Sequence, residues 1–482
     1  MTGAKVDGTA DNSAVYDPEL NFRPLVKPAA WLASTLLVLL SLFHYYTAGF
    51  GLFREATHRG VHLAFVLGLI FLVFALDRRQ HGGPPALSLW RPGGVPWFDW
   101  LLVLLAAAAA LYIPLVFDDL AFRIGNPWTI DIVVGSLMIA LVLEATRRAV
   151  GPTLPIIAVL FIVYALLGQY APGVLVHPGA SWTNLVNHLY LTSQGIYGIP
   201  VGVVATYVFH FVLFGVLATK IGLGQLFIDL ASAIAGRFIG GPAKVAVLSS
   251  AMLGTISGSS IANTVTTGAL TIPAMKRLGY PPHFAGGVEA TASAGGQITP
   301  PIMGAAAFIM VEFLEIAYRE ILLAALVPAA MHYLGVFTMV HLEARKLGLR
   351  GLRRDELPNV GRVLARDWPT LIPLVLLVAM IVLGYTPYLA AFVGITGCVV
   401  IGMVNPKNRL TLRELFKAFE LGAKYALAVG AAAATVGIVV GVVSLTGMGF
   451  KLSFMITSLA AGWSESIVAW LPAALVDPAS LT

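Results

Sequence analysis

The chain has 482 residues, of which 58% are apolar and only 11% are charged. A soluble domain carries about 25% charged residues, so this composition excludes a soluble globular protein, a disordered chain, collagen and a coiled coil. The net charge of +6, the mean hydropathy of +0.85 and the single cysteine, Cys398, instead indicate a polytopic membrane protein. We expect no nucleic-acid partner, no intramolecular disulfide and no multi-cysteine metal site.

The chain begins with a polar segment, residues 1–28, that lacks the basic start and the cleavage site of a signal peptide. We expect a cytoplasmic tail there. Beyond it, several segments reach the roughly 20 apolar residues that a membrane-spanning helix needs. They predict ten spans, at 29–50, 59–77, 97–117, 130–147, 152–170, 200–219, 321–342, 368–385, 388–404 and 425–446.

The distribution of Lys and Arg among the loops predicts the orientation. Loop 171–199 has neither residue, whereas loop 343–367 has seven of them and loop 405–424 has five. Cytoplasmic loops are enriched in Lys and Arg, so we place loop 171–199 outside and the other two inside. The spans and loops then divide the chain into six parts, at 1–28, 29–150, 151–199, 200–345, 346–367 and 368–482.

Segment 242–277 is apolar but too short and too polar at its centre for two spans. Only 31 residues separate Lys244 from Lys276, and both ends carry positive charge. Two full spans would need about 40 residues. The centre is rich in Gly, Ser and Thr, which predicts a re-entrant helical hairpin that enters and leaves on the cytoplasmic side and turns next to a cavity. The alternative is a helix–helix contact through Gly254 and Gly258.

Segment 284–316 starts as a helix and then meets GGQITPP at residues 295–301. Two consecutive prolines remove two hydrogen-bond donors and clash with preceding carbonyls, so the helix must break. Broken helices in transporters direct a positive helix start at an anionic substrate and free carbonyls at Na⁺. The alternative is a proline kink without a ligand.

A partial internal repeat is visible after spans 200–219 and 425–446. Each span is followed by a Gly-rich start and an apolar helix, at 222–236 and at 447–462. In the first, Gln225, Asp229, Ser232 and Gly236 fall on one stripe, as in an amphipathic helix at the membrane interface. Because the two spans run in opposite directions, the arrangement fits an inverted repeat. Chance similarity between Gly-rich apolar segments is the alternative.

The segment SGSSIANTVTTGALTIPAMKRLGYPPHFAGGVEATASAGGQITPPIMGAAAFIM resembles the first hairpin and broken helix of the large membrane subunit of TRAP transporters. These are tripartite, ATP-independent, binding-protein-dependent importers. The motifs GGQITPP and GAAAFIMVEFL resemble those of the branch in which small and large subunits are fused and the partner is a TAXI-type periplasmic binding protein. Residues 29–150 then resemble the small subunit, and 200–482 the large one.

The resemblance implies a multi-pass protein of a bacterial inner membrane that imports an organic acid of the C4-dicarboxylate, keto acid or amino acid class. Na⁺ is the expected coupling ion and an elevator movement the expected mechanism. The implied Na⁺ site comprises Ser257, Gly258, Ser259, Asn263, Gly295, Gly296 and Thr299. The implied substrate site comprises Ser259, Ser260, Asn263, Thr264, Gln297 and Thr299. The expected partners are the TAXI-type protein, the organic acid and the lipid bilayer.

The chain departs from the family pattern at its C-terminus. A second hairpin and a second broken helix are expected there, but only 20 residues follow Gly462, and they contain neither motif. We therefore expect a shortened second repeat and, as a hypothesis, no transport by this chain alone. Another chain supplying the second hairpin is a further expected partner.

Other residues leave alternatives open. Glu289 is either functional, as intramembrane carboxylates usually are, or an interfacial carboxylate near Lys276, Arg277 or His283. We expect Glu144 to form a helix-end salt bridge with Arg147 and Arg148.

Three alternatives to the tripartite importer remain at this stage. One is a Na⁺/anion symporter without a binding protein, and another is an inactive remnant. The third is a membrane hydrolase using Ser259 or Ser260. Residues 250–275 contain no general base for such a serine, so we expect a protein that is not an enzyme. His210, within span 200–219, is expected to be a packing histidine rather than a proton relay.

Overall fold

The computed structural model describes residues 22–76, 91–407 and 409–468. Within these ranges all regular elements are helices, which confirms the predicted all-α class. Nine helical stretches in the described part are long and apolar enough to cross a membrane. The remaining predicted span, 152–170, corresponds to α7 (Thr153–Leu166), which is a shorter apolar helix. Most of the expected tail, 1–28, and of the final segment, 463–482, lies outside the described residues.

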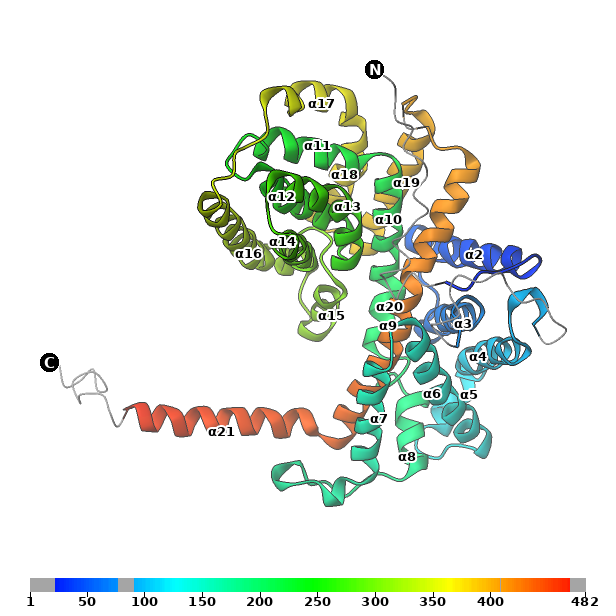
Figure 1. The fold of residues 1–482 in the computed structure, drawn as a ribbon. Coiled ribbons are helices and arrows are strands. Elements are labelled where there is room, and N and C mark those ends of the chain that lie inside the picture. The colour runs from blue at the N-terminus through cyan, green and yellow to red at the C-terminus, as the bar shows by residue number, and fades with distance from the viewer. Residues whose placement is uncertain (1–21, 77–90, 408, 469–482) are drawn as a thin grey trace.

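The N-terminal block contains the first four spans, and α3 and α4 pack along each other (Figure 1). Its α-helices are α2 (Ala29–Phe50), α3 (Glu55–Val73), α4 (Trp97–Leu115), α5 (Phe117–Arg123) and α6 (Thr129–Ala149). After α7, the segment predicted to lie outside contains one short α-helix, α8 (Trp182–Val186), followed by a π-helical turn over Asn187–Leu191.

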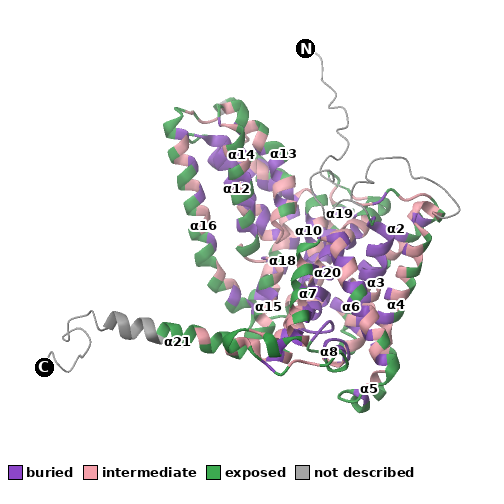
Figure 2. Cartoon of the chain, turned by 60° about the horizontal axis from the view of Figure 1, so that its bottom comes forward, coloured by how far each residue is buried: buried purple, intermediate pink, exposed green. Residues whose placement is uncertain are grey.

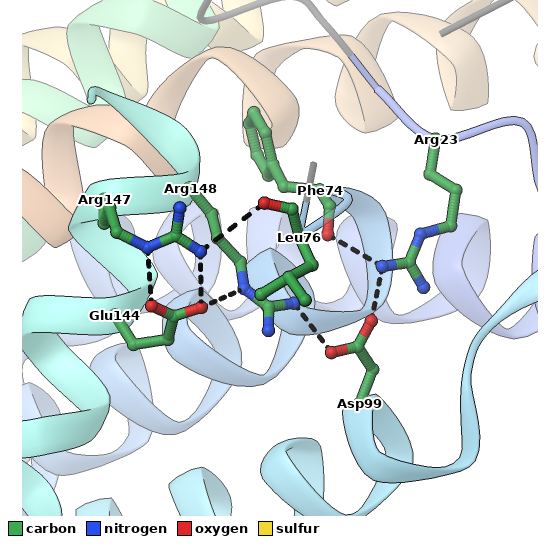
Figure 3. Close-up of polar contacts among 7 residues, drawn as sticks. All are labelled: Arg23, Phe74, Leu76, Asp99, Glu144, Arg147 and Arg148. Carbon is green, nitrogen blue, oxygen red and sulfur yellow. Dashed lines mark hydrogen bonds and ion pairs between the residues drawn. The ribbon is translucent and has the colours of Figure 1, made fainter. Parts of the chain in front are cut away.

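An ionic network connects the segment before α2, the start of α4 and the end of α6 within the N-terminal block (Figure 3). Asp99 is fully buried and pairs with Arg23 at 2.5 Å and with Arg148 at 2.7 Å. Glu144 pairs with both Arg147 and Arg148 at 2.7 Å, which confirms the predicted salt bridge. Burial lowers the pKa of the Arg23 guanidinium, and its hydrogen bond to Asp99 opposes that change. Removing one partner would leave an uncompensated buried charge, so the network holds α4 and α6 in register.

Two central helices connect the blocks. The first runs over Ile199–Lys220 and comprises α9 (Ile199–Val203), a π-helical turn and α10 (Phe209–Lys220). The second, α20 (Leu412–Thr446), begins at Thr411, whose side chain and that of Glu414 form a capping box. It therefore starts earlier than the predicted span, 425–446. The α20 helix packs against α2, α3, α6 and α10.

A second body lies beside the central helices (Figure 1). Its helices are α11 (Leu223–Ala235), α12 (Gly241–Ser257), α13 (Ser260–Leu278), α14 (Pro282–Ala294), α15 (Ala305–Leu314) and α16 (Tyr318–Lys346). We call this group the hairpin body. It contains a small hydrophobic core of its own, separate from the main core, in which Met275, Val288 and Val340 are buried. In Figure 2, α12 is largely buried, whereas much of α16 is exposed.

The remaining helices are α17 (Val360–Asp367), α18 (Ile372–Val382), α19 (Pro387–Val404) and α21 (Met448–Val468). Asp367, at the end of α17, pairs with Lys407 from the other basic loop. The two loops that the charge pattern places in the cytoplasm therefore lie together, on one face of the protein.

The two arms of the predicted repeat lie at opposite ends of the molecule (Figure 1). After α10, Gly222 turns the chain with φ 100°, and after α20, Gly447 turns it with φ 64°. The first arm, α11, is tied to the basic loop by an ion pair between Asp229 and Arg366 at 2.9 Å. The second arm, α21, touches the outer segment, where Lys451 donates to the Val176 carbonyl at 2.7 Å. These contacts place the arms on opposite faces.

Candidate functional site

The predicted hairpin is present as two antiparallel helices, α12 and α13, joined by a tight turn. Gly258 ends α12 with φ 59°, a left-handed conformation that favours glycine. The next residue, Ser259, caps α13 by accepting a hydrogen bond from the Ala262 amide at 3.3 Å. The Gly-Ser pair that the sequence places at the tip therefore forms the turn itself.

The predicted broken helix is also present and packs directly against the hairpin. A 3₁₀ turn over Gly295–Ile298 follows α14, and the helix resumes only at Ala305. A Cβ atom on Gly254 would lie 2.6 Å from the Gly296 Cα. Glycine at both positions allows the two backbones to come this close. Gly254 therefore packs the hairpin against the broken helix and does not form a contact with another span.

Two buried oxygen atoms near this contact have no hydrogen-bond partner within the described residues. Asn263 is buried and donates through Nδ2 to the Ser250 carbonyl at 2.9 Å, which leaves its Oδ1 unpaired. The Ser257 Oγ, at the end of α12, is also unpaired. Buried polar atoms are nearly always paired, so two unpaired oxygens next to the broken helix indicate room for a ligand.

Other predicted site residues link the tip to the break. Gln297 donates to the Ser260 hydroxyl at 3.1 Å, across the two segments. The Thr299 hydroxyl lies 2.6 Å from the Gly295 carbonyl and 3.0 Å from the Tyr333 hydroxyl on α16. In contrast, the Thr264 hydroxyl bonds the Ser260 carbonyl within its own helix at 2.8 Å. The structure thus gathers the predicted set, with Thr264 satisfied locally.

A cavity of about 270 Å³ separates the hairpin from the central helices. Hairpin residues, including Ser257 and Asn263, line one wall. The opposite walls come from α10 and α20, and Lys220 is the charged residue of the lining. Lys220 ends α10 beside the basic-loop face, so the cavity lies toward the predicted cytoplasmic side. Neither Lys220 nor the α20 wall belongs to the predicted site, because their sequence carries no motif that marks them.

Glu289 is fully buried in α14, with hydroxyl groups around its carboxylate. Its hydrogen-bond partners in the described structure are Ser250, Thr267, Thr271 and Ser293. Of the two alternatives for this residue, the interfacial carboxylate is therefore wrong. The sequence analysis missed the hydroxyl partners, although Asn263, Thr267 and Thr271 recur every four residues and so lie along one face of α13.

His210 is buried and its Nε2 lies 2.8 Å from the His44 carbonyl oxygen, which agrees with the predicted packing role. The sequence analysis missed three further buried histidines nearby, His44, His58 and His62, which come from α2 and α3. His44 Nε2 lies 2.9 Å from His62 Nδ1. In the described part of the chain, no group of three or more His, Cys, Asp or Glu residues is arranged to hold a metal ion.

The two tip serines lack the partners of a hydrolytic nucleophile. Ser259 caps α13, and Ser260 accepts from Gln297. Within the described residues, neither hydroxyl has a hydrogen bond to a histidine, lysine or carboxylate. A serine nucleophile needs such a base within hydrogen-bond reach, so this geometry gives no support to the hydrolase alternative.

Comparison with known families shows what the chain is similar to. Residues 137–476 match the profile of a family described as "Tripartite ATP-independent periplasmic transporter, DctM component". The match covers most of the chain and includes the hairpin, the broken helix and both central helices. It begins inside α6, so the first spans of the N-terminal block lie outside it.

Three relatives illustrate the similarity. The C4-dicarboxylate TRAP transporter large permease protein DctM of Pseudomonas aeruginosa is 30% identical over 161 residues, 33% of this chain and 35% of the relative. The isethionate TRAP transporter permease protein DctMQ of Oleidesulfovibrio alaskensis is 27% identical over 343 residues, 66% of this chain and 50% of the relative. The sialic acid TRAP transporter permease protein SiaT of Haemophilus influenzae is 25% identical over 207 residues, 43% of this chain and 33% of the relative.

These relatives are named as transporter permeases and not as enzymes, in agreement with the expectation from the sequence. The chain spans half or less of the length of each of the three. The DctMQ match extends further along this chain than the other two.

Proposed function

Because the chain belongs to the DctM family of tripartite ATP-independent periplasmic transporters, we propose that it is the membrane permease of a Na⁺-coupled secondary importer of organic acids. In this proposal the N-terminal block takes the place of a fused small subunit. A TAXI-type periplasmic binding protein delivers the solute to the outer segment, 171–199, of a protein in the bacterial inner membrane.

The cavity between the hairpin and the central helices is the observation that carries this proposal. Its volume of about 270 Å³ suits a small solute. Its lining is mainly apolar, with hydroxyl and amide groups at the hairpin and one cation, Lys220. Such a lining fits an organic acid, because the ammonium group attracts the carboxylate while the apolar wall contacts the carbon skeleton.

The tip and the break fit a Na⁺ ion. The oxygen ligands available there are the unpaired side-chain oxygens of Asn263 and Ser257. The Gly295 and Gly296 carbonyls accept hydrogen bonds from Thr299 at 2.6 and 3.4 Å, and each keeps a second lone pair for an ion. Hard cations prefer oxygen ligands, and broken transporter helices supply free carbonyls for Na⁺. When bound, the ion would add positive charge beside the cavity and so favour an anionic solute. Because the ion joins hairpin to break, we expect it to stiffen this contact.

Residues of α12, α13, α14 and α16 share a hydrophobic core of their own, which supports the movement of these helices as a unit. The main core extends into the hairpin body through α11 and α15, so this packing would have to slide during the movement. A rigid unit that carries the site can expose the cavity first to one face of the membrane and then to the other. The cavity lining includes Lys220 at the end of α10, beside the basic loops that the charge pattern assigns to the cytoplasm. We assign this arrangement to the inward-facing stage of an elevator cycle.

Uptake by reconstituted protein tests the proposal. The purified chain is placed in liposomes with an inward Na⁺ gradient and the cognate binding protein. Labelled succinate, pyruvate and glutamate represent the three solute classes. Because the shortened second repeat predicts no transport by this chain alone, the assay also includes a version extended by the missing second hairpin and broken helix. We expect the extended version to accumulate one class in a manner that depends on Na⁺ and on the binding protein. Accumulation without the binding protein would favour a simple symporter, and exchange of none of the three solutes would count against an importer of these acids.

A binding measurement on the chain alone separates the Na⁺ site from transport. Na⁺, but not K⁺, should raise the midpoint of thermal unfolding in detergent, because a ligand bound only to the folded state stabilises it. The substitution Asn263→Ala should reduce that increase. Thr338→Val is a matched control, since the Thr338 hydroxyl bonds only within exposed α16. An equal response in all three proteins would overturn the assignment of the site.

A further inference from the structure

Glu289 forms an unusual buried site within the hairpin body. Its side chain has no exposure to solvent. The Ser250 and Ser293 hydroxyls each donate to its Oε1 at 3.2 Å. Thr267 donates to the same oxygen, and Thr271 donates to Oε2. Three helices, α12, α13 and α14, therefore place hydroxyl groups on one buried carboxylate.

No charged group compensates this carboxylate within the described residues. On α12, Lys244 is turned to His341 of α16, with 3.0 Å between Nζ and Nδ1. On α16, His332 bonds the Thr291 carbonyl, and Tyr333 bonds Thr299. Lys276, Arg277 and His283 are exposed at helix ends and have no hydrogen bond or ion pair to Glu289. Tyr280 is buried and donates to the Gly240 carbonyl at 3.5 Å. The charged groups of α16 lie toward its two ends, without a hydrogen bond or ion pair to Glu289, namely Arg319, Glu320, Glu343, Arg345 and Lys346. A buried carboxylate without a cation is costly in its ionised form, so its retention needs a functional reason.

The surrounding hydroxyls satisfy both protonation states. The Thr267 hydroxyl also lies 2.8 Å from the Asn263 carbonyl, and the Thr271 hydroxyl lies 3.0 Å from the Thr267 carbonyl. When Glu289 is ionised, both threonines donate to it. When Glu289 is protonated, a threonine can turn its hydrogen to the carbonyl and accept the carboxyl proton instead. Rotation of two hydroxyls is therefore enough to accommodate the gain or loss of a proton.

The same geometry is poorly suited to a metal cation at this position. The carboxylate oxygens are in direct hydrogen bonds with the hydroxyls, so a metal ion would have to displace these contacts. The unpaired oxygens that suit a cation belong to Ser257 and Asn263, nearer the hairpin tip. The two positions are nevertheless connected, because the Thr267 hydroxyl bridges Glu289 and the backbone of Asn263.

We propose that Glu289 binds and releases a proton during the transport cycle, so that proton movement is coupled to solute uptake through the hairpin body. This inference rests on the proposed transport function. It adds a coupling proton at a position separate from the Na⁺ site at the tip. Protonation changes whether Thr267 bonds Glu289 or Asn263, and through Asn263 it reaches the tip.

Infrared difference spectroscopy detects such a proton without any transport. The full chain in lipid nanodiscs is titrated with acid and base, and the C=O stretching band of a protonated carboxylic acid is followed. We expect a pH-dependent band that is lost in Glu289→Gln and shifted in frequency in Glu289→Asp, which keeps a carboxyl group if Glu289→Gln fails to fold. Glu320→Gln, at an exposed position on α16, should keep the band. A band that is unchanged in both Glu289 variants would overturn the proposal, as would its absence from the wild type.

A transport measurement then separates coupling from solute binding. Liposomes that contain the version extended by the second hairpin, with an inward pH gradient and equal Na⁺ on both sides, should accumulate the labelled acid that the importer accepts. Glu289→Gln should lose this accumulation but keep the exchange of labelled for unlabelled solute at equal pH. Loss of neither would overturn proton coupling. Failure of the wild type to exchange succinate, pyruvate or glutamate would instead argue against the proposed importer, while the infrared result would still decide whether Glu289 binds a proton.

Discussion

The Tyr207 hydroxyl on the first central helix donates a hydrogen bond of 3.1 Å to Glu312 Oε1 on α15. This bond joins the hairpin body to the central helices through the second half of the broken helix. Aromatic rings extend the contact, since Phe308 stacks on Tyr207 at 5.7 Å and on Phe211 at 5.0 Å between centroids. An elevator movement of the hairpin body would have to break this contact in each cycle.

Tyr207→Phe should therefore weaken the arrangement seen in this structure while keeping the ring packing. Loss of one hydrogen bond corresponds to about 1 kcal/mol, or a roughly fivefold change in the ratio of the two states. Spin labels at Thr338→Cys on α16 and Lys417→Cys on α20 would report the change as a new distance population. Tyr385→Phe, at an exposed position, is the control. Identical distance distributions in all proteins would rule out a holding role for Tyr207.

Asp99→Asn should strongly destabilise the N-terminal block. The substitution leaves the buried Arg148 and Arg23 guanidinium groups without their carboxylate, and breaking a buried ion pair costs about 3–5 kcal/mol. Thermal unfolding of the purified protein measures the loss. Asp118→Asn breaks an exposed pair with Arg54 and should change stability by less than about 1 kcal/mol. Similar unfolding curves for the two variants would contradict the structural role of the network.

Gly254→Ala should separate the hairpin from the break. Its new Cβ would lie 2.6 Å from the Gly296 Cα, and overpacking of this kind costs about 1–3 kcal/mol. We expect a lower unfolding midpoint and a smaller increase on adding Na⁺. Gly335→Ala is a matched control, because no atom lies within 4 Å of its added Cβ. In the interior of α16 it should be neutral or stabilising, by about 0.5–1 kcal/mol. A full Na⁺ response in Gly254→Ala would separate the ion site from this contact.

Lys220→Met should weaken binding of an anionic solute in the cavity. Loss of the charge in the lining should raise the solute KM about tenfold, equivalent to about 1.4 kcal/mol. Uptake at varied solute concentration measures the effect. Lys417→Met removes an exposed charge on α20 that is absent from the lining, and it should leave KM unchanged. Equal KM values for both variants would show that Lys220 does not contact the solute.

Much of the fold follows from the sequence, because length and apolar composition are local properties. Nine of the ten predicted spans, the hairpin at 242–277 and the break at Pro300 and Pro301 are present in the described structure. The predicted span 425–446 omits the first turns of α20, which begins at Leu412. Those turns are polar, and only the Thr411 capping box marks the start of the helix. α7 is shorter than predicted, because a turn begins at Gly168 within its apolar run.

The candidate site was predictable only in part. The sequence marks the tip and the break, because hydroxyl residues, glycines and prolines are atypical of a lipid-facing helix. The pairing of Asp99 with Arg148 depends on the packing of α4 against α6, and no spacing along the chain reveals it. The hydroxyl partners of Glu289 likewise come from three helices whose rotation about their axes is set by tertiary packing. Local motifs thus identify the site, while its partners require the assembled structure.

The packing of α20 against the N-terminal block has a consequence for assembly from two separate chains. Ser41 of α2 donates to the Phe419 carbonyl at 2.7 Å, and the Thr146 hydroxyl of α6 lies 2.7 Å from that of Thr435. These contacts join the N-terminal block to the rest without using the peptide link between α6 and α7. If the chain were cut at Gly151, the two pieces made in one cell should recognise each other and co-purify. Tethering then serves chiefly to fix their ratio and speed their meeting, and the interface itself supplies the affinity.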